Sequence, residues 1–246
     1  MCTLTWWSAP DGYEVFFNRD ELRTRGGAAP PSLQIWQGMR FLAPLDRPSG
    51  GTWLLANQAG VTLAILNLYE RELPEIPGAV YRSRGLFLRS LADCRSLEEV
   101  AGRLGRDPVN HCNAFTLLGF DQSGAAGFRV WRWIHDRERL SGPDPDPAMP
   151  VCSSSVDTVR VVEARRRAFG EIVRHDRSGP ESLWAFHHFD QGGRPSADTV
   201  LMCRPDARTL SISRVRVGPD RVRFAYEEIP EAGVGPGEPV IVELER

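Results

Sequence analysis

Lysine is missing from this sequence, so the 30 residues counted as lysine or arginine are all arginines. Schiff-base enzymes, pyridoxal phosphate enzymes, phosphate-loop nucleotidases and protein kinases each require a lysine amine. The sequence therefore excludes these classes. Its richness in alanine, glycine, proline and arginine is typical of a GC-rich genome, from which we infer a bacterial source.

Several other signals are also lacking. The five cysteines are odd in number, widely spaced and without a Cys-x-x-Cys pair, so we expect neither a disulfide framework nor a metal site. No secretory leader is recognisable, and no window approaches about 18 uninterrupted apolar residues. The formal charge of -2 does not favour nucleic acid. We expect a cytoplasmic chain without a membrane span or a cofactor, whose partner is a small-molecule substrate or cargo.

Hairpins are the clearest local pattern. The β-prone runs CTLTWW and YEVFFNRD flank a Pro-Asp-Gly turn and predict that the chain begins with a hairpin, with Cys2 at the free end of its first strand. A Gly- and Pro-rich loop follows. The stretch GGTWLLANQAGVTLAILNL predicts a second hairpin, and the runs NAFTLLGFD and GFRVWRWI predict a third.

Two segments have helical signals. In RSLEEVAGRL, Ser96 is an expected N-cap and Glu99 follows three residues later; with RGLFLRSLADC this predicts one or two helices. In VDTVRVVEARRRAFGEIVRH, Asp157 is an expected N-cap, and PESLWAFHHF begins with a proline suited to a first helical turn. These predict a second helical pair.

The remaining segments complete a layered pattern. SGPDPDPAMP is so rich in proline that we expect an exposed loop without regular structure, whereas DTVLMCRP, TLSISRVRV and RVRFAYEEI predict strands of a meander. Strands, helices, strands, helices and strands in this order are typical of an α+β fold with two stacked antiparallel sheets covered by helices. We expect one domain over residues 1–246.

Cys2 is the candidate nucleophile. Removal of the initiator methionine is expected when the second residue is small, and Cys2 would then carry both a thiol and a free α-amine. Because an α-amine has a pKa of about 7.7 to 8, it can accept the thiol proton near neutral pH. The alternative is that Cys2 is a packing residue.

The run FFNRDE lies at the end of the strand expected to pair with the strand of Cys2, so its residues return beside the N-terminus. Arg19 could favour the thiolate, and Asp20 could hold the α-amine by a charge-assisted hydrogen bond. The alternative is an ordinary charged exit from a strand.

Four blocks, MCTLTWW, FFNRDE, GGTWLLANQAG and LAILN, resemble in order and spacing the NRDE family of the transport and Golgi organisation type. The likeness is strong over roughly the first 70 residues. It implies the N-terminal-nucleophile (Ntn) hydrolase fold, a four-layer αββα sandwich of two antiparallel sheets.

The resemblance also implies roles for residues. Cys2 matches the nucleophile, Arg19 and Asp20 match a charged pair, and Asn67 matches an asparagine suited to an oxyanion hole. The alternative for Asn67 is an asparagine at a strand end that bonds to a turn. Substrate-binding residues expected beside them are Asn18, Asn113 and Ser155.

Two positions depart from the family pattern. Where relatives carry Leu-Ser-Asn before a helix, this chain has CSSS, so Ser154 and Ser155 stand where an asparagine is expected. The arginine that precedes the last strands is shifted or absent, with Arg194 the nearest one. These differences bear on substrate and turnover.

Histidines and tryptophans suggest simpler roles. Neighbours on a helix diverge by about 100°, so His187 and His188 are expected on a helix surface rather than at one metal ion. The tryptophans at positions 6, 7, 131 and 133 are expected to fill the core or to line the rim of a pocket, with the core preferred.

The leading hypothesis is a cysteine Ntn hydrolase that cleaves the carbon-nitrogen bond of a small non-peptide amide. The alternative is a non-catalytic binding or trafficking protein for haem or lipid cargo, a role that the family resemblance also includes. A papain-like enzyme would need an internal cysteine with a histidine partner, and the sequence has no signature for it.

Overall fold

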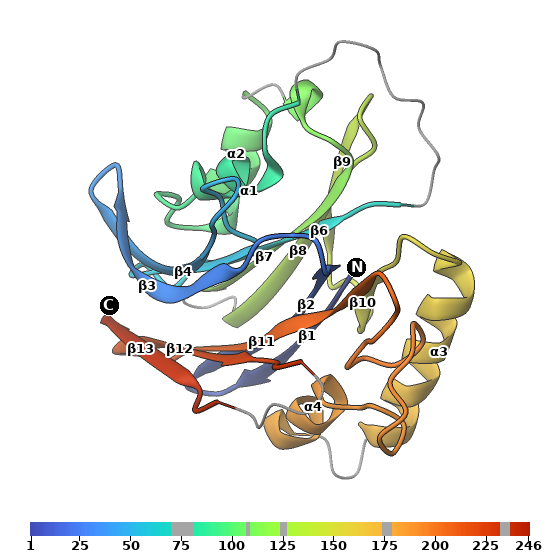
Figure 1. Cartoon of the computed structure of the whole chain (residues 1–246). Coiled ribbons are helices and arrows are strands. Elements are labelled where there is room, and N and C mark those ends of the chain that lie inside the picture. The colour runs from blue at the N-terminus through green and yellow to red at the C-terminus, as the bar shows by residue number, and fades with distance from the viewer. Residues whose placement is uncertain (70–80, 107–108, 124–126, 174–178, 232–236) are drawn as a thin grey trace. The chain divides into compact units, whose positions relative to one another are not determined.

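The computed structural model describes residues 1–69, 81–106, 109–123, 127–173, 179–231 and 237–246 (Figure 1). The strands are β1 (Cys2–Ala9), β2 (Gly12–Leu22), β3 (Ala28–Trp36), β4 (Met39–Asp46), β5 (Leu54–Asn57), β6 (Thr62–Asn67), β7 (Phe115–Ser123), β8 (Gly127–His135), β9 (Leu140–Pro145), β10 (Val151–Ser153), β11 (Ala207–Val217), β12 (Arg221–Glu228) and β13 (Val240–Glu245). The helices are α1 (Arg84–Arg89), α2 (Leu97–Leu104), the short 3-10 helix η1 (Val109–His111), α3 (Thr158–Ile172) and α4 (Pro180–His187).

The strands form two sheets. One has the order β10-β1-β2-β11-β12-β13, and the other has the order β3-β4-β5-β6-β7-β8-β9. The chain divides into two compact units: the first is Met1–Gly26, Ala148–Val217 and Arg223–Ile241, and the second is Gly27–Pro147, Gly218–Val222 and Val242–Arg246. A single domain over the whole chain stays a prediction.

The first hairpin has the register that its sequence predicts. β1 and β2 pair antiparallel from Cys2 opposite Arg19 to Ala9 opposite Gly12, with the tight turn at Pro10 and Asp11. β11 pairs with the other edge of β2, and β10 pairs with the free edge of β1. The end of β1 that carries Cys2 is therefore flanked by strands on both sides.

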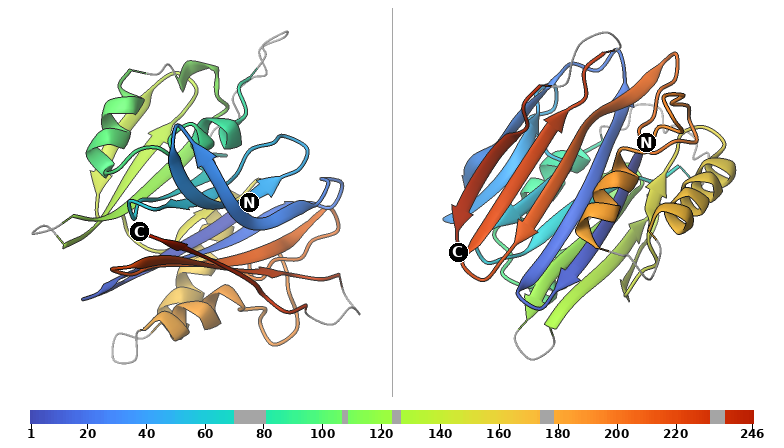
Figure 2. Two further views of the ribbon diagram at one scale, coloured as in Figure 1. Left: turned by 90° about the vertical axis from the view of Figure 1, so that its left-hand side faces the viewer. Right: turned by 90° about the horizontal axis from the view of Figure 1, so that it is seen from below.

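Helices α3 and α4 pack on one face of this six-stranded sheet (Figures 1 and 2). Phe16 of β2 stacks on His187 with ring centroids 5.8 Å apart and also contacts Trp184 of α4. Phe186 packs edge-on against Phe169 of α3 at 5.2 Å. Because burial of such apolar surface is the main stabilising contribution to folding, these contacts hold the helices on the sheet.

In the second unit, α1 and α2 pack on the seven-stranded sheet. Ser96 Oγ accepts from Glu99 N at 3.3 Å and caps α2, as its sequence predicts. Gly51 is required by close packing, because a Cβ atom there would lie 2.5 Å from the carbonyl carbon of Gly85 in α1. Asn57 organises the NQAG turn: its Oδ1 accepts from the main chain within the turn, and its Nδ2 donates to the carbonyl groups of Ala92 and Cys94.

Several predictions of secondary structure were wrong. The segment expected as a loop before the second hairpin contains β3 and β4, a regular antiparallel pair. The proline-rich segment contains β9, which pairs with β8 at the edge of the sheet, where proline is tolerated because one side of the strand needs no partner. The expected strand DTVLMCRP has only a single bridge, at Cys203, and β13 was not predicted.

Candidate active site

Four side chains from neighbouring strands form a row around Cys2. Cys2 lies opposite Arg19 of β2 and opposite Ser153 of β10, and Arg19 lies opposite Ser211 of β11. Residues directly opposite one another in a sheet project to the same face. We call Ser153, Cys2, Arg19 and Ser211 the Cys2 row, which lies on the face turned away from α3 and α4.

Met1 occupies the start of the same strand. Its α-amino group donates to the Asp20 carbonyl at 3.2 Å, and Asp20 N donates to the Met1 carbonyl at 3.0 Å. Met1 is only 6% exposed, because its side chain packs against Val161, Met202 and Ala207 on the helix-covered face. The methionine therefore extends the β-ladder by one residue. Its peptide bond to Cys2 leaves the Cys2 nitrogen as an amide rather than a free amine.

The Cys2 thiol is not activated while Met1 is attached. Burial raises the pKa of the Cys2 thiol to about 11; the positive N-terminus opposes this effect, and the carboxylate of Asp20 adds to it. A thiol with this pKa is protonated at neutral pH, whereas the thiolate is the nucleophile. Cys2 in this form would react slowly.

Arg19 is the cation of the Cys2 row. Its side chain is 5% exposed and its Nη2 lies 3.9 Å from the carboxylate of Glu21. Burial raises the pKa of the Tyr226 hydroxyl, and the charge of Arg19 opposes that shift, which places Tyr226 within electrostatic reach of Arg19. Arg19 and Cys2 are thus brought together on one face, as the sequence predicts.

The carboxylate of Asp20 points to the opposite face. Its Oδ2 accepts from both terminal nitrogens of Arg165 at 3.2 Å, and its Oδ1 accepts from Thr209 Oγ1 at 2.6 Å. The expectation that this carboxylate holds the N-terminal amine is not what the structure shows with Met1 in place. The main-chain carbonyl of Asp20 makes that contact instead.

Sequence reasoning missed Arg165, which has no exposed surface. Besides Asp20, its guanidinium donates to Thr3 Oγ1 at 2.5 Å. The signal was present in the helical spacing, because Val161, Arg165 and Ala168 are the buried positions of α3 and a charge on a buried face needs a partner. Arg194, considered for a family arginine, is exposed.

Asn18 also faces the helices. Its Nδ2 donates to the carbonyls of His187 and Val200 at 2.9 and 3.0 Å, and its Oδ1 lies 2.5 Å from His187 Nδ1. His187 Nε2 lies 2.8 Å from Thr5 Oγ1. Both amide hydrogens of Asn18 are used inside the unit, so the structure does not bring this side chain to the face of Cys2, where we expected it to bind substrate.

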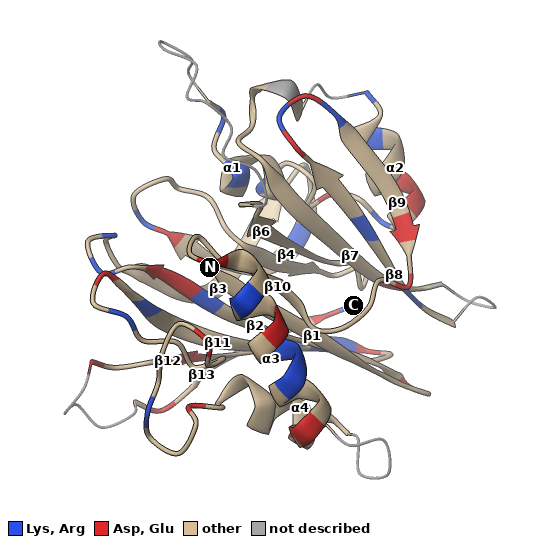
Figure 3. Ribbon diagram, turned by 90° about the vertical axis from the view of Figure 1, so that its right-hand side faces the viewer, with Lys and Arg blue, Asp and Glu red and all other residues tan. Residues whose placement is uncertain are grey.

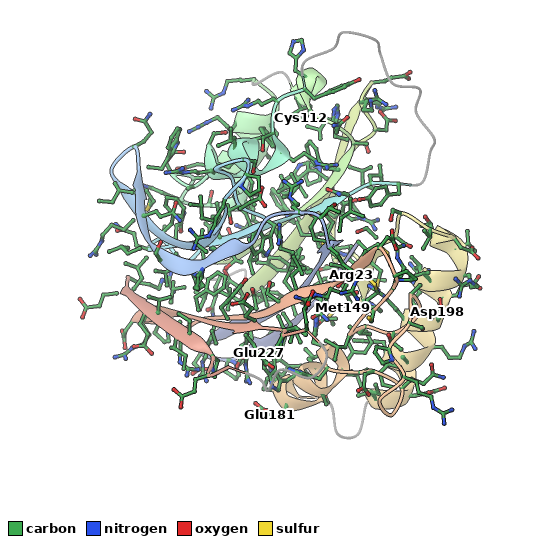
Figure 4. The ribbon with its side chains drawn as sticks, in the orientation of Figure 1. Arg23, Cys112, Met149, Glu181, Asp198 and Glu227 are labelled. Atoms are coloured by element: carbon green, nitrogen blue, oxygen red, sulfur yellow. The ribbon has the colours of Figure 1, made fainter. Side chains whose placement is uncertain are left out.

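The expectation of a helix surface was wrong for His187, which is fully buried. Burial lowers the pKa of its imidazole to about 3, so the ring is neutral at physiological pH. His188 is partly exposed and donates to Glu227 of β12 (Figure 4) across 3.0 Å. The two rings serve different contacts, in agreement with their divergence on the helix.

The serines that replace the family asparagine differ in exposure. Ser154 is buried and its hydroxyl bonds to the main chain of Val156, whereas Ser155 is exposed. Ser153, which the sequence did not single out, is 7% exposed, and its hydroxyl has no hydrogen-bond partner among the residues that the structure describes. Among these serines, Ser153 is the one beside Cys2.

Asn67 and Asn113 belong to the second unit. Asn67 ends β6 opposite Phe115, is partly exposed, and donates to the Tyr69 hydroxyl at 2.6 Å. Asn113 is exposed and lies just before β7. Both asparagines present amides at the ends of strands.

Within the described ranges, no three His, Cys, Asp or Glu side chains are grouped so that they could hold a metal ion. All five cysteines are free thiols. No helix in the same ranges has the length and apolar character needed to cross a membrane.

Solved structures share this fold at low sequence identity. The C2A mutant of conjugated bile acid hydrolase from Clostridium perfringens matches with a TM-score of 0.56 and 14% identity, over 100% of this chain and 92% of that one. A second variant of that hydrolase matches with a TM-score of 0.53 and 14% identity, over 99% and 92% of the two chains. The N-acylethanolamine-hydrolyzing acid amidase orthologue from Caenorhabditis elegans matches with a TM-score of 0.59 and 9% identity, over 87% and 92%.

These likenesses confirm the expected fold class, the α+β class of Ntn hydrolases with αββα architecture. No curated protein sequence matches the chain. The model of the family described as Transport and Golgi organisation 2 matches residues 1–200, which include the first hairpin, the Cys2 row apart from Ser211, and Asn67. This match covers most of the sequence, and the chain therefore belongs to the Transport and Golgi organisation 2 family.

Proposed function

We propose that this protein is a cysteine Ntn hydrolase that cleaves the carbon-nitrogen bond of a small non-peptide amide. The observation that carries the proposal is the Cys2 row, in which Cys2 at the start of β1 lies between a buried arginine and a buried serine hydroxyl. The fold supports it, since two of the similar structures are named as a conjugated bile acid hydrolase and an N-acylethanolamine-hydrolyzing acid amidase.

Removal of Met1 is the first requirement. Cleavage of the Met1–Cys2 peptide bond would leave the α-amine and the thiol on one residue, and the amine could then accept the thiol proton. It would also vacate the position opposite Asp20 and move the charged N-terminus onto Cys2 itself. The positive N-terminus opposes the effect of burial on the pKa of this thiol, and its move onto Cys2 would strengthen that opposition.

The reaction then proceeds in two steps. Cys2 Sγ attacks the amide carbonyl carbon and its proton passes to the α-amine, which returns a proton to the departing amine nitrogen as the carbon-nitrogen bond breaks. A thioester remains on Cys2. Water, deprotonated by the same amine, attacks the thioester carbonyl and releases the carboxylic acid with the thiol restored.

The neighbouring side chains have separate roles in this proposal. Arg19 stabilises the thiolate by its charge, and the Ser153 hydroxyl donates a hydrogen bond to the substrate or to the developing oxyanion. Asn67 supplies an oxyanion-hole amide, a role that rests on the resemblance. Asn113 and Ser155 remain proposed contacts to the substrate on the same basis.

A binding protein for haem or lipid cargo is the second candidate. It rests on the family resemblance, and it needs no activated thiol: while Met1 is attached, burial holds the pKa of the Cys2 thiol at about 11. A carrier would function in this form, because binding does not require a nucleophile.

Three measurements separate the candidates. Intact mass of the purified protein should show that Met1 is absent, and the protein should hydrolyse members of a panel of N-acyl amides with apolar acyl groups. Cys2→Ala should abolish this turnover. Cys94→Ala is the matched control, because Cys94 is a buried thiol of the second unit whose pKa burial also raises to about 11.

The opposite pattern would support the carrier. Met1 retained in the mature protein, together with haem or fatty acid binding that survives Cys2→Ala, contradicts the hydrolase proposal. Turnover that survives Cys2→Ala contradicts it as well.

A further inference from the structure

Arg165 places a buried positive charge directly behind the N-terminus. We propose that Arg165 is a positioning residue of the N-terminal nucleophile: it orients the Asp20 carboxylate and balances its charge, so that the α-amine of Cys2 can be unprotonated near neutral pH. This inference rests on the proposed function, because it concerns the same amine.

The contacts of Arg165 link it to both sides of the terminus. Its Nη1 and Nη2 each lie 3.2 Å from Asp20 Oδ2, and Asp20 pairs with Met1 across the hairpin. Its Nη1 also donates to Thr3, the residue that follows Cys2. The guanidinium therefore holds Thr3, which follows Cys2, and the side chain of Asp20, which lies opposite Met1, although it is not bonded to Cys2 itself.

Charge balance is the physical reason for the proposal. A carboxylate without a partner beside a buried ammonium group stabilises the protonated amine, and an opposite charge within about 4 to 6 Å commonly shifts a pKa by about 1 to 3. An amine held protonated in this way cannot accept the thiol proton. The pair formed by Asp20 and Arg165 has no net charge, and the carboxylate still accepts hydrogen bonds.

The other ionisable groups around the pair do not neutralise the charge of the Asp20 carboxylate. Cys152 of β10 faces it, and burial raises the pKa of its thiol while Arg165 and Arg166 oppose that shift. His187 of α4 is neutral, because burial lowers the pKa of its imidazole and the charge of Arg165 lowers it further. Arg204 lies 3.4 Å from the sulfur of Met1.

The chain also presents Asp206 and Glu21 near the terminus. Asp206 pairs with Arg204 at 2.6 Å, and Glu21 lies 3.6 Å from Arg25 as well as near Arg19. Each of these carboxylates has its own cation. Among the described residues, Arg165 is the cation that bonds directly to Asp20.

A purely structural role is the competing explanation. Buried ion pairs are often no more stabilising than apolar residues of similar volume, so the presence of this pair does not by itself show a need for stability. The two explanations differ in what they predict for the α-amine. A structural role alters folding, whereas a positioning role alters the titration of the amine in molecules that are folded.

The absence of lysine makes this titration measurable. The α-amine is the only primary amine of the chain, so an amine reagent such as trinitrobenzenesulfonate labels one amine, which is read on the N-terminal peptide apart from the remaining thiols. The protein is released from a removable N-terminal leader with residue 2 first, in a Cys2→Ala background that removes the competing thiol. Mass spectrometry of the N-terminal peptide then gives the labelling rate as a function of pH.

Three variants are compared in this background. Arg165→Met removes the charge and keeps much of the length of the side chain, Arg165→Lys restores a positive charge, and Arg166→Met changes the exposed neighbour of Arg165. Figure 3 shows that α3 carries basic residues along its ribbon. We expect Arg165→Met to slow labelling at pH 7 by about tenfold, which corresponds to a rise of about one pKa unit. At high pH the labelling rates of all variants should converge. Arg165→Lys and Arg166→Met should be labelled at pH 7 at nearly the rate of the parent protein.

Other results overturn the inference. The midpoint of the α-amine titration could be unchanged in Arg165→Met, or it could shift equally in Arg165→Lys or in Arg166→Met. Each of these results would show that the charge of Arg165 does not set the pKa of the amine. A labelling rate that changes by the same factor at every pH would show altered access to the amine with an unaltered pKa, and it would overturn the inference as well. If Arg165→Met does not fold, a midpoint in Arg165→Lys that differs from the parent by as much as one unit decides against the proposal.

The leader separates this test from the proposed function. Retention of Met1 in protein expressed without the leader would defeat the hydrolase proposal. It would not affect the titration of the α-amine in protein released from the leader. A normal titration in Arg165→Met would defeat the role of Arg165 while the hydrolase proposal still stood.

Discussion

Met1 and Asp20 exchange two main-chain hydrogen bonds, from Met1 N to Asp20 O at 3.2 Å and from Asp20 N to Met1 O at 3.0 Å. In an antiparallel ladder, bonded and non-bonded pairs alternate. Cys2 and Arg19, the next pair, are therefore of the non-bonded type, in which side chains approach most closely. This alternation explains how one hairpin can place a thiol and a guanidinium together.

The first prediction concerns the order of folding and methionine removal. Since Met1 is buried and bonded through both its amine and its carbonyl, an aminopeptidase should not trim the folded chain. We expect purified protein that carries Met1 to resist added methionine aminopeptidase, whereas a peptide of residues 1–9 is trimmed under the same conditions. Intact mass checks both. Rapid trimming of the folded protein would show that the terminus opens readily.

The second prediction distinguishes the serines after β10. Ser153 is buried beside Cys2 with a hydroxyl that lacks a partner in the described part of the chain, while Ser155 is exposed. If Ser153 donates to a charged intermediate, its loss should cost about 1.5 to 3 kcal/mol, or about tenfold to a hundredfold in kcat/KM. Steady-state kinetics of Ser153→Ala and Ser155→Ala test this. A larger loss in Ser155→Ala would favour the role that the family resemblance implies.

The third prediction concerns stability. Arg165→Met leaves the carboxylate of Asp20 buried without its ion partner, and removal of one member of a buried pair typically costs about 3 to 5 kcal/mol. Addition of Asp20→Asn should recover part of this loss, because the uncompensated charge disappears. Urea unfolding followed by tryptophan fluorescence measures both free energies. A double variant less stable than Arg165→Met would contradict the pairing.

The fourth prediction concerns acid pH. The pKa of His187 is about 3 in the folded chain, against an ordinary value of about 6.5 when unfolded. Between these values the unfolded chain binds the extra proton, so stability falls as pH decreases, by up to about 1.4 kcal/mol per pH unit. His187→Gln should flatten this dependence between pH 7 and pH 5. The exposed His111→Gln serves as control, and an equal effect there would contradict the assignment.

Short-range patterns were sufficient for much of the fold. The Pro-Asp-Gly turn, the N-caps Ser96 and Asp157, and the β-prone runs of β7 and β8 each encode their element locally. The edge strand β9 could not be predicted in this way, because a proline-rich segment becomes a strand only when a partner strand such as β8 accepts it at an edge.

The candidate site shows the same division. The FFNRDE run and the position of Cys2 were enough to bring Arg19 beside the thiol, because hairpin register follows from the turn. The direction of Asp20 was not foreseen, since successive side chains of β2 alternate between faces and only the helices decide which face is the interior. The buried role of His187 has the same cause.

By itself, the sequence determined the absence of lysine chemistry, the opening hairpin and the pairing of Cys2 with Arg19, because these depend on composition and on residues close in the chain. Only the tertiary structure decided that Ser153 completes the Cys2 row and that Arg165 neutralises Asp20. Those partners are separated by about 150 residues, and it is the docking of β10 and α3 against the first hairpin that brings them together.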